Sequence, residues 1–287
     1  MIGLRSKRII TDSIIYIVLL VMIFLWLFPL VWMILRAFDT APGTMSSSIF
    51  PQGYTGDNFK ALFPGGVSNY DSYPYLQWFF NTLLVAVISC TICTLFILMV
   101  SYALSRLRFK ARKKLMNIAL ILGLFPGFLS MFALYYIFSL LELTDNLIGL
   151  ALAYSLASGT GYYIVKGFFD TVPVAIDEAA RIDGASRNRI FWQMIIPLSK
   201  PIIIYTILTT FIGPWCDYIM ASVFIKDSNK MTIAVGIRSW INSLETQQKY
   251  FTRFCAGGVV ISIPIVALYM VMQKFYVAGI TGGAAKG

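Results

Sequence analysis

The stretch DEAARIDGASRNRIFWQMIIPLSKP occupies residues 177–201, and it is polar and charged within a chain that is 58% hydrophobic and only 13% charged. A loop that merely joins two apolar spans does not need this ordering of helix formers, glycine and proline. The pattern predicts two short helices separated at Gly184, because a helix end favours a left-handed residue that glycine adopts without strain. Ser186 is placed to cap the second helix, and Pro197 and Pro201 end it.

The first of these helices carries acidic residues in its early turns. Asp177 and Glu178 suit the positive end of the helix dipole, and Asp177 is expected to pair with Arg181 four residues later. The adjacent Ala179 and Ala180 leave the helix surface almost bare, so another surface could approach it closely.

The second helix has one apolar face, which predicts that it lies along the membrane surface or against other helices. The residues of this face are Ile190, Phe191, Met194 and Ile195. From the residues alone, two interpretations of 177–201 stay open. It is either an ordinary interfacial loop or a rigid docking element that presents Glu178 to a partner.

The remainder of the chain predicts an all-α integral membrane protein with six transmembrane helices, because a helix needs about 20 apolar residues to cross a bilayer. A cleaved signal peptide is a poor explanation of the first run, whose apolar core is too long and has no small-x-small site after Leu35. The six runs are residues 14–35, 79–104, 115–141, 147–165, 202–225 and 254–275.

The net charge of +10, with no histidine, is distributed as membrane topology requires rather than as a nucleic-acid footprint. Most of the 23 Lys and Arg residues fall before the first run, in 105–114, in 166–201 and at the C-terminal end. The positive-inside rule therefore predicts that both termini are cytoplasmic. We expect a cytoplasmic N-terminus (1–13), a membrane domain (14–275) with a cytoplasmic loop (170–201), and a cytoplasmic tail (276–287).

The sequence lacks the residue patterns that several kinds of chemistry require. There is no phosphate-binding loop motif, no nucleophile–base pair, and no metal-ligand set, so neither enzymatic activity nor a bound cofactor is expected. The cysteines lie in or beside apolar runs and are expected to be core residues (Cys90, Cys93, Cys216 and Cys255). Buried ionisable residues are too few for a typical ion-coupled carrier.

The residues Glu178-Ala179-Ala180-x-x-Asp183-Gly184-Ala185, followed by Phe191, Pro197 and Pro201, resemble the EAA signature of permease subunits of bacterial ATP-binding-cassette importers. Further stretches are similar to the carbohydrate branch, and in particular to its maltose and maltodextrin-type second permease. They are FFNTL (79–83), SYALSRLRFKARKK (101–114), GLALAY (149–154) and VAGITGGAAKG (277–287). Cys216 and Ala133 depart from the usual pattern and leave the sugar undecided.

This resemblance implies the type I importer permease fold in the bacterial cell membrane, with a coupling helix in the loop 170–201. Its coupling residues would be Glu178, Ala179, Ala180, Asp183, Gly184 and Ala185. The implied partners are a second homologous permease, two ATPase subunits that bind ATP and Mg, and an extracytoplasmic sugar-binding protein that docks on the outer loops, chiefly 226–253. An importer of another solute class is the alternative, followed by an ion-coupled carrier or channel.

Three residues are candidates for the sugar path. Gly213-Pro214 interrupts the fifth run, and Trp215 and Asp217 could offer stacking and hydrogen bonding just beyond it. Interface packing is an equal explanation for Trp215. Asn81 either lines the path or, as we favour, holds helices together.

Overall fold

The computed structural model describes residues 4–43, 49–64, 73–124, 126–157 and 161–284. The ends of the predicted N-terminal segment (1–3) and of the predicted tail (285–287) therefore lie outside the described residues. Two compact units divide the chain, and each is described by itself. Unit 1 comprises residues 1–73 and 237–260, and unit 2 comprises residues 74–236 and 261–287.

Unit 1 contains α1 (Leu4–Ala37), α2 (Asp57–Lys60), the short helix Ser239–Ile241 and the first part of α14 (Leu244–Ala284). Arg36, at the end of α1, is buried and forms an ion pair with Asp39, and it also donates a hydrogen bond to the carbonyl of Gly43. Thr252 on α14 bonds Asn58 through their side chains (3.1 Å). The ion pair thus fixes the turn after α1, and the hydrogen bond of Thr252 joins the two chain segments of unit 1.

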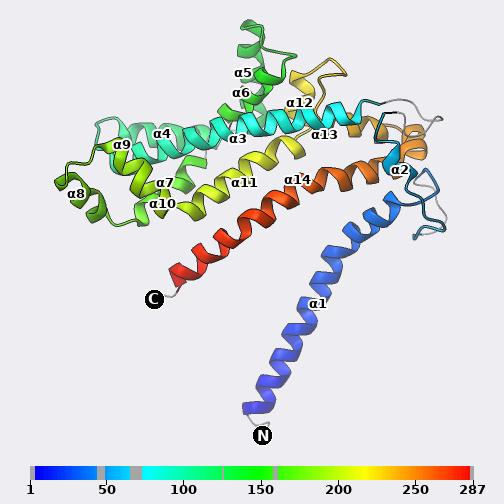
Figure 1. Cartoon of the computed structure of the whole chain (residues 1–287), viewed down its shortest axis with the longest axis horizontal. Coiled ribbons are helices and arrows are strands. Elements are labelled where there is room, and N and C mark those ends of the chain that lie inside the picture. Colours follow the sequence, from blue (N-terminus) through cyan, green and yellow to red (C-terminus); the bar gives the residue numbers. More distant parts are fainter. Residues whose placement is uncertain (1–3, 44–48, 65–72, 125, 158–160, 285–287) are drawn as a thin grey trace. The chain divides into compact units, whose positions relative to one another are not determined.

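Unit 2 is built on α3 (Tyr75–Arg106), against which α6 (Leu147–Ala157), α7 (Gly161–Thr171) and α11 (Lys200–Cys216) pack (Figure 1). The bounds of its other helices are α4 (Arg112–Gly123), α5 (Gly127–Leu140), α8 (Val174–Ile182), α9 (Arg187–Ile190), α10 (Ile196–Leu198), α12 (Ile219–Phe224) and α13 (Ile233–Arg238). One apolar core lies around Phe224 on α12, and a second lies around Phe169 on α7.

The described helices allow the six predicted spans. Three of them (residues 10–37, 75–106 and 244–273) are each long and apolar enough to cross a membrane. Three bent pairs meet the same test when each is counted as one span: α4 with α5, α6 with α7, and Arg187–Leu198 with α11. The number of spans by length and composition is therefore three, or up to six.

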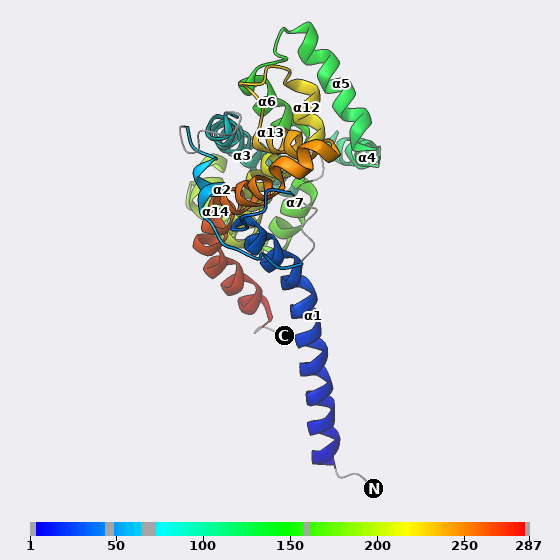
Figure 2. The same ribbon diagram turned by 90° about the vertical axis from the view of Figure 1, so that its right-hand side faces the viewer.

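The third predicted run, 115–141, is not one straight helix. Its two halves, α4 and α5, are bent by 103° (Figure 2). Pro126 is extended (φ −54°, ψ 128°) directly before α5, and proline has no backbone N–H for a continuous helix. The apolar pattern predicted the right residues as apolar helix but could not predict the angle.

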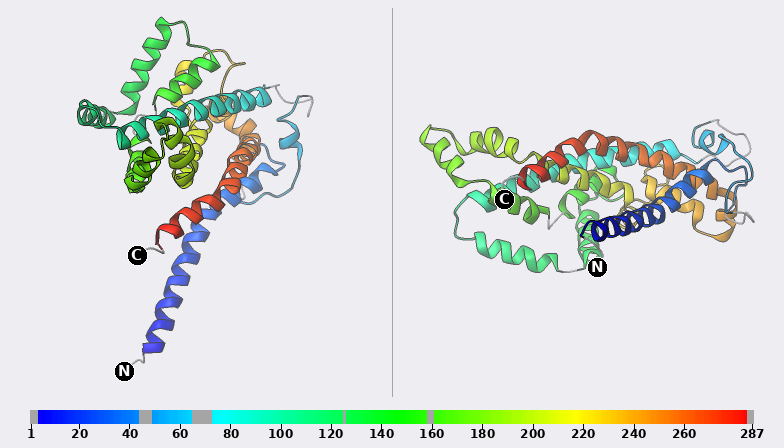
Figure 3. Two further views of the ribbon diagram at one scale, coloured as in Figure 1. Left: turned by 60° about the vertical axis from the view of Figure 1, so that its left-hand side comes forward. Right: turned by 90° about the horizontal axis from the view of Figure 1, so that it is seen from below.

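Different elements pack at the two ends of α3 in unit 2. Near the N-terminus of α3, Trp78 donates to the carbonyl of Ser228 and Thr82 accepts from the N–H of Ile233. At the C-terminus of α3, Arg106 contacts α7 and α8, and α8 with α9 extends beyond the helices packed on α3 (Figure 3). The predicted loop 170–201 is therefore concentrated at one end of the unit.

Candidate functional site

The first feature of the site is α8 with the turn that ends it. Gly184 has φ +78°, the left-handed value predicted for it. The N–H of Ala185 donates to the carbonyl of Ala180, and the N–H of Gly184 donates to that of Arg181. This pair of bonds is a Schellman motif, which satisfies the last carbonyls of a helix and fixes the direction in which the chain leaves. The turn is rigid because its own backbone bonds define it.

The following helix starts as predicted, since the side chain of Ser186 accepts from the N–H of Arg189 (3.3 Å). It does not continue as a uniform α-helix. Residues Phe191–Ile195 form a π-helical turn before Pro197, and proline cannot donate to the carbonyl four residues earlier. Ile190, Phe191 and Ile195 are buried, as the apolar face predicted. The segment Arg187–Leu198 meets α11 at 84°, which fits a helix lying along the membrane surface.

Asp177 has a different partner from the one expected. Its carboxylate oxygen lies 3.1 Å from Nε of Arg106, at the end of α3, and both side chains are nearly fully buried. The prediction that Asp177 pairs with Arg181 is therefore wrong. Arg106 also donates to the carbonyls of Phe169 (2.9 Å) and Val172 (2.7 Å). One guanidinium thus holds the end of α3, the end of α7 and the start of α8 together.

The structure divides the six candidate coupling residues between two faces of the α8 region. Glu178, Ala179, Asp183 and Gly184 are exposed, whereas Ala180 is buried and Ala185 is half-buried against the core around Phe169. Ile182 is also on the exposed side, with 87% of its surface accessible. The result is a small helix with an exposed acid and an exposed apolar side chain, anchored from behind by the Arg106–Asp177 pair.

The three candidate path residues do not gather at one place. Asn81 donates to the carbonyls of Asn229 (2.8 Å) and Met231 (3.0 Å), so it holds the segment between α12 and α13 against α3 rather than joining two helices. Trp215 is buried and packs against Phe79, with ring centres 5.2 Å apart. Asp217 accepts a hydrogen bond from the hydroxyl of Tyr154 (2.7 Å).

Asp217 also lines a cavity of about 890 Å³ between the α4–α5 pair and the start of α12. This cavity is mainly apolar, with Ser130 and Tyr162 among its few other polar side chains. Asp217 is half-buried, and its other carboxylate oxygen accepts from the N–H of Ile219 at the start of α12 (3.0 Å).

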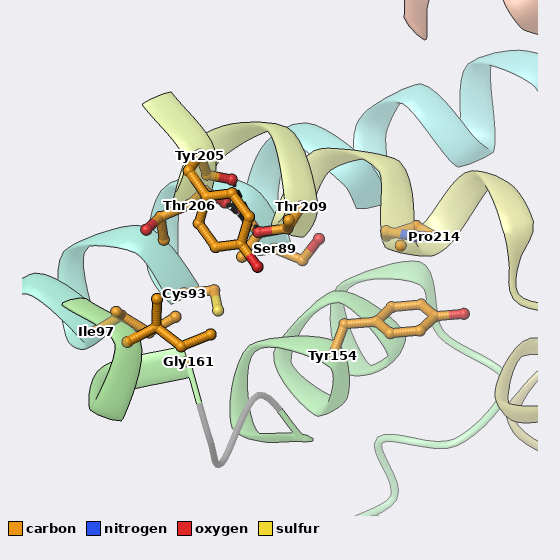
Figure 4. Close-up of a pocket in the computed structure, with 12 residues that line it drawn as sticks. Ser89, Cys93, Ile97, Tyr154, Gly161, Tyr205, Thr206, Thr209 and Pro214 are labelled. Atoms are coloured by element: carbon orange, nitrogen blue, oxygen red, sulfur yellow. Dashed lines mark hydrogen bonds between the residues drawn. The ribbon is translucent and has the colours of Figure 1, made fainter. Parts of the chain in front are cut away.

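A second cleft, of about 380 Å³, was not predicted (Figure 4). Its wall combines side chains of α3 and α11 with Tyr154 on α6 and the start of α7. The signal for it in the sequence is the run of small or hydroxyl residues at helical spacing on one face of α11: Thr206, Thr209, Thr210 and Gly213. Within the described part of the chain, no three potential metal ligands come together.

In unit 2, Asp145 organises the loop before α6. The backbone N–H groups of Asp227 and Lys226 and the ammonium of Lys230 all bond its carboxylate. These contacts, the backbone bonds above all, lower the pKa of Asp145 to about 2. The loop 141–146 and the segment 225–230 are therefore held together by a charged hydrogen-bond network.

The described chain thus combines helices that are long and apolar enough to cross a membrane with a short exposed helix, α8, that is anchored to α3. The family model for the binding-protein-dependent transport system inner membrane component matches residues 97–282, which is more than half of the chain. The chain belongs to this family.

Similar proteins point to the same class over nearly the whole length. The galactooligosaccharides transport system permease protein GanQ of Bacillus subtilis (strain 168) is 33% identical, covering 95% of this chain and 94% of the relative. The maltodextrin transport system permease protein MalD of Streptococcus pneumoniae (strain ATCC BAA-255 / R6) is 32% identical, covering 99% of both.

The fold also matches a solved structure of a bacterial ABC transporter involved in the import of the acidic polysaccharide alginate. The TM-score is 0.74 and the match covers 96% of this chain and 99% of that chain. The sequences are 22% identical, so this likeness establishes the fold and nothing about the cargo.

Proposed function

We propose that this chain is a transmembrane subunit of an ATP-driven sugar importer, forming half of the translocation path for a neutral, maltodextrin-like oligosaccharide. The observation that carries the proposal is α8, a short helix that is exposed on one face and fixed to α3 and α7 by Arg106 on the other. The names of the similar proteins support the substrate class, since they include permeases for maltodextrin and for galactooligosaccharides.

The proposed partners follow from this role. A second, homologous permease completes the path, and two ATPase subunits bind ATP and Mg on the cytoplasmic side, where α8 docks. An extracytoplasmic sugar-binding protein docks on the opposite side, with the segment 226–253 as its main contact. This chain itself then hydrolyses nothing, and both of its termini are cytoplasmic, in the multi-pass arrangement that the distribution of Lys and Arg favours.

In this proposal Glu178, Ala179, Asp183 and Gly184 form the docking face, while Ala180 and Ala185 seat α8 on the bundle. When the ATPase subunits close, α8 moves with them. Because Arg106 bonds α7 and α8 at once, the movement passes to α3 and α7 as a rigid-body displacement rather than being absorbed in the loop. ATP binding by the partners thus shifts the equilibrium between inward-open and outward-open states.

Transport by the reconstituted complex tests the proposal. The chain is placed in liposomes with its second permease and ATPase subunits, and the uptake of radiolabelled maltotriose and of a galactotriose is measured with ATP inside and the binding protein outside. ATP-dependent uptake of either sugar, absent when the ATPase subunits are left out, is expected. Sugar uptake by this chain alone without ATP would contradict the proposal and favour a carrier or channel.

A further inference from the structure

The cleft between α3, α6, α7 and α11 combines hydroxyl groups with aromatic rings and has no charge. Its volume of about 380 Å³ falls in the range of small-ligand sites, roughly 300–1,000 Å³. Among the described residues that line it there is no Asp, Glu, Lys, Arg or His. A site of this kind suits a neutral polyol and gives no counter-charge to an acidic or basic cargo.

Thr209 supplies the hydroxyl best placed for a ligand. Its neighbour Thr210 faces α3, with its hydroxyl 3.4 Å from that of Thr94 and 3.3 Å from the sulfur of Cys90, so it joins the two helices. The hydroxyl of Thr209 instead donates to carbonyls of its own helix (Tyr205 and Thr206, both 3.0 Å) and lies exposed in the cleft (Figure 4). Its oxygen lone pairs can still accept a hydrogen bond.

Pro214 adds a second acceptor to the same wall. Proline has no backbone N–H, so the carbonyl of Thr210, one turn earlier, lacks the donor that every other residue would provide in a helix. Both residues line the cleft. A backbone carbonyl that lacks its usual helical donor needs another donor in a membrane-embedded helix, and the hydroxyl groups of a sugar in the cleft are suitable ones.

Two tyrosines from different helices border the cleft. The hydroxyl of Tyr154 is bonded to Asp217, which fixes the position of the ring on α6. The side chain of Tyr205 on α11 is 37% exposed and extends over the cleft beside Thr209 (Figure 4). Flat apolar rings with polar edges suit pyranose units, which have apolar C–H faces and polar rims.

We propose that this cleft is a carbohydrate-contact subsite, in which Thr209 and the Thr210 carbonyl hydrogen-bond to sugar hydroxyls while Tyr154 and Tyr205 contact the faces of the pyranose rings. The proposal rests on the proposed function and deepens it, since it gives this subunit its own contacts with a passing neutral sugar. It also predicts poor transport of oligosaccharides built from uronic acids.

Thr209→Val tests the subsite, because it removes the hydroxyl and keeps the side-chain shape. Thr91→Val is the matched control, since Thr91 is also an exposed threonine bonded to a carbonyl four residues earlier (Val87, 2.8 Å) but does not line the cleft. In the reconstituted complex, Thr209→Val is expected to lower maltotriose uptake about 2- to 10-fold, as for the loss of one hydrogen bond. Thr91→Val should leave uptake at the wild-type rate.

A labelling experiment separates sugar contact from a structural role. Cysteine is placed at position 209 or 91 in a Cys216→Ser complex, since Cys216 is the exposed native thiol among those described. Maltotriose with the loaded binding protein should slow maleimide labelling at position 209 several-fold and leave position 91 unchanged.

Equal uptake by Thr209→Val and Thr91→Val, together with no protection at position 209, would overturn the subsite and leave the proposed function standing. A wild-type complex without ATP-driven uptake of either maltotriose or the galactotriose would overturn the proposed function and the subsite together.

Discussion

Nε of Arg106 lies 3.1 Å from the carboxylate of Asp177, and the two side chains retain only 4% and 6% of their exposure. They come from the last turn of α3 and the first turn of α8, with all of α4 to α7 between them in sequence. Buried charges that meet over such a separation fix the relative position of two elements. The pair thus links the exposed helix α8 to the end of α3.

Removal of one partner of this pair is expected to destabilise the fold strongly. Asp177→Asn keeps the shape but leaves the guanidinium of Arg106 buried without a counter-charge, which costs about 3–5 kcal/mol. We expect a lower thermal unfolding midpoint in detergent and a loss of ATP-driven uptake. The control is Asp57→Asn, which breaks an exposed pair with Lys60 on α2 and should leave the unfolding midpoint nearly unchanged, because exposed ion pairs contribute little. Equal stability of the two variants would contradict the role of the pair.

Gly184→Ala tests the turn after α8. No atom lies within 4 Å of the added Cβ, so the only penalty is the left-handed backbone, φ +78°, worth about 1–2 kcal/mol. Gly167→Ala on α7 is the matched control, since it has equal space and helical φ and should be neutral or slightly stabilising. We expect reduced uptake per ATP hydrolysed for Gly184→Ala alone. Identical coupling ratios for both variants would show that the turn does not transmit movement.

Glu178→Lys tests the docking face without disturbing the bundle, because Glu178 is exposed. Reversal of a rim charge changes the encounter with a partner by electrostatic repulsion. Membrane insertion should be normal, whereas co-purification of the ATPase subunits and uptake should fall at least tenfold. Glu142→Lys, an exposed reversal in the loop after α5, is the control and should bind the ATPase subunits normally. If the Glu178→Lys variant binds the ATPase subunits as well as the wild type does, this face of α8 is not the docking face.

The hydrogen bonds of Asp145 predict that the stability of the loop before α6 depends on pH. Its pKa of about 2 is below the usual value of about 3.9, so the carboxylate stabilises the folded loop. That contribution is complete above pH 4 and is lost as the pH falls from about 4 to 2. Hydrogen exchange of the Lys226 and Asp227 amides should be unchanged between pH 7 and 5, after correction for intrinsic rates. Asp145→Asn should speed it at pH 7, and unchanged protection in that variant would refute the network.

Local features of the site could be predicted from sequence because they depend on neighbouring residues. The left-handed Gly184 and the Ser186 cap are examples, and both are confirmed. The partner of Asp177 could not be predicted in this way, since Arg106 is close only in the folded chain. A pairing rule that considers one helix at a time selects Arg181 instead.

The membrane core shows the same distinction. The apolar runs predicted which residues form helices. The 103° angle between α4 and α5, next to Pro126, could not be predicted, because it depends on how the two helices pack in the folded chain. The cleft beside Thr209 was missed because Thr206, Thr209 and Thr210 are dispersed in an apolar run. Their shared face becomes apparent only when α11 is placed against α3 and α6.

A photo-crosslinking experiment tests the central claim, that α8 docks on an ATPase subunit, most directly. A photoreactive side chain replaces Ile182, the 87% exposed residue of α8, and in a second variant it replaces Ile219, which is 60% exposed on α12. In the assembled complex, position 182 should crosslink to the ATPase subunit, with a yield that changes when ATP is added, and position 219 should not. Crosslinking to the ATPase subunit from position 219 but not from position 182 would contradict the account.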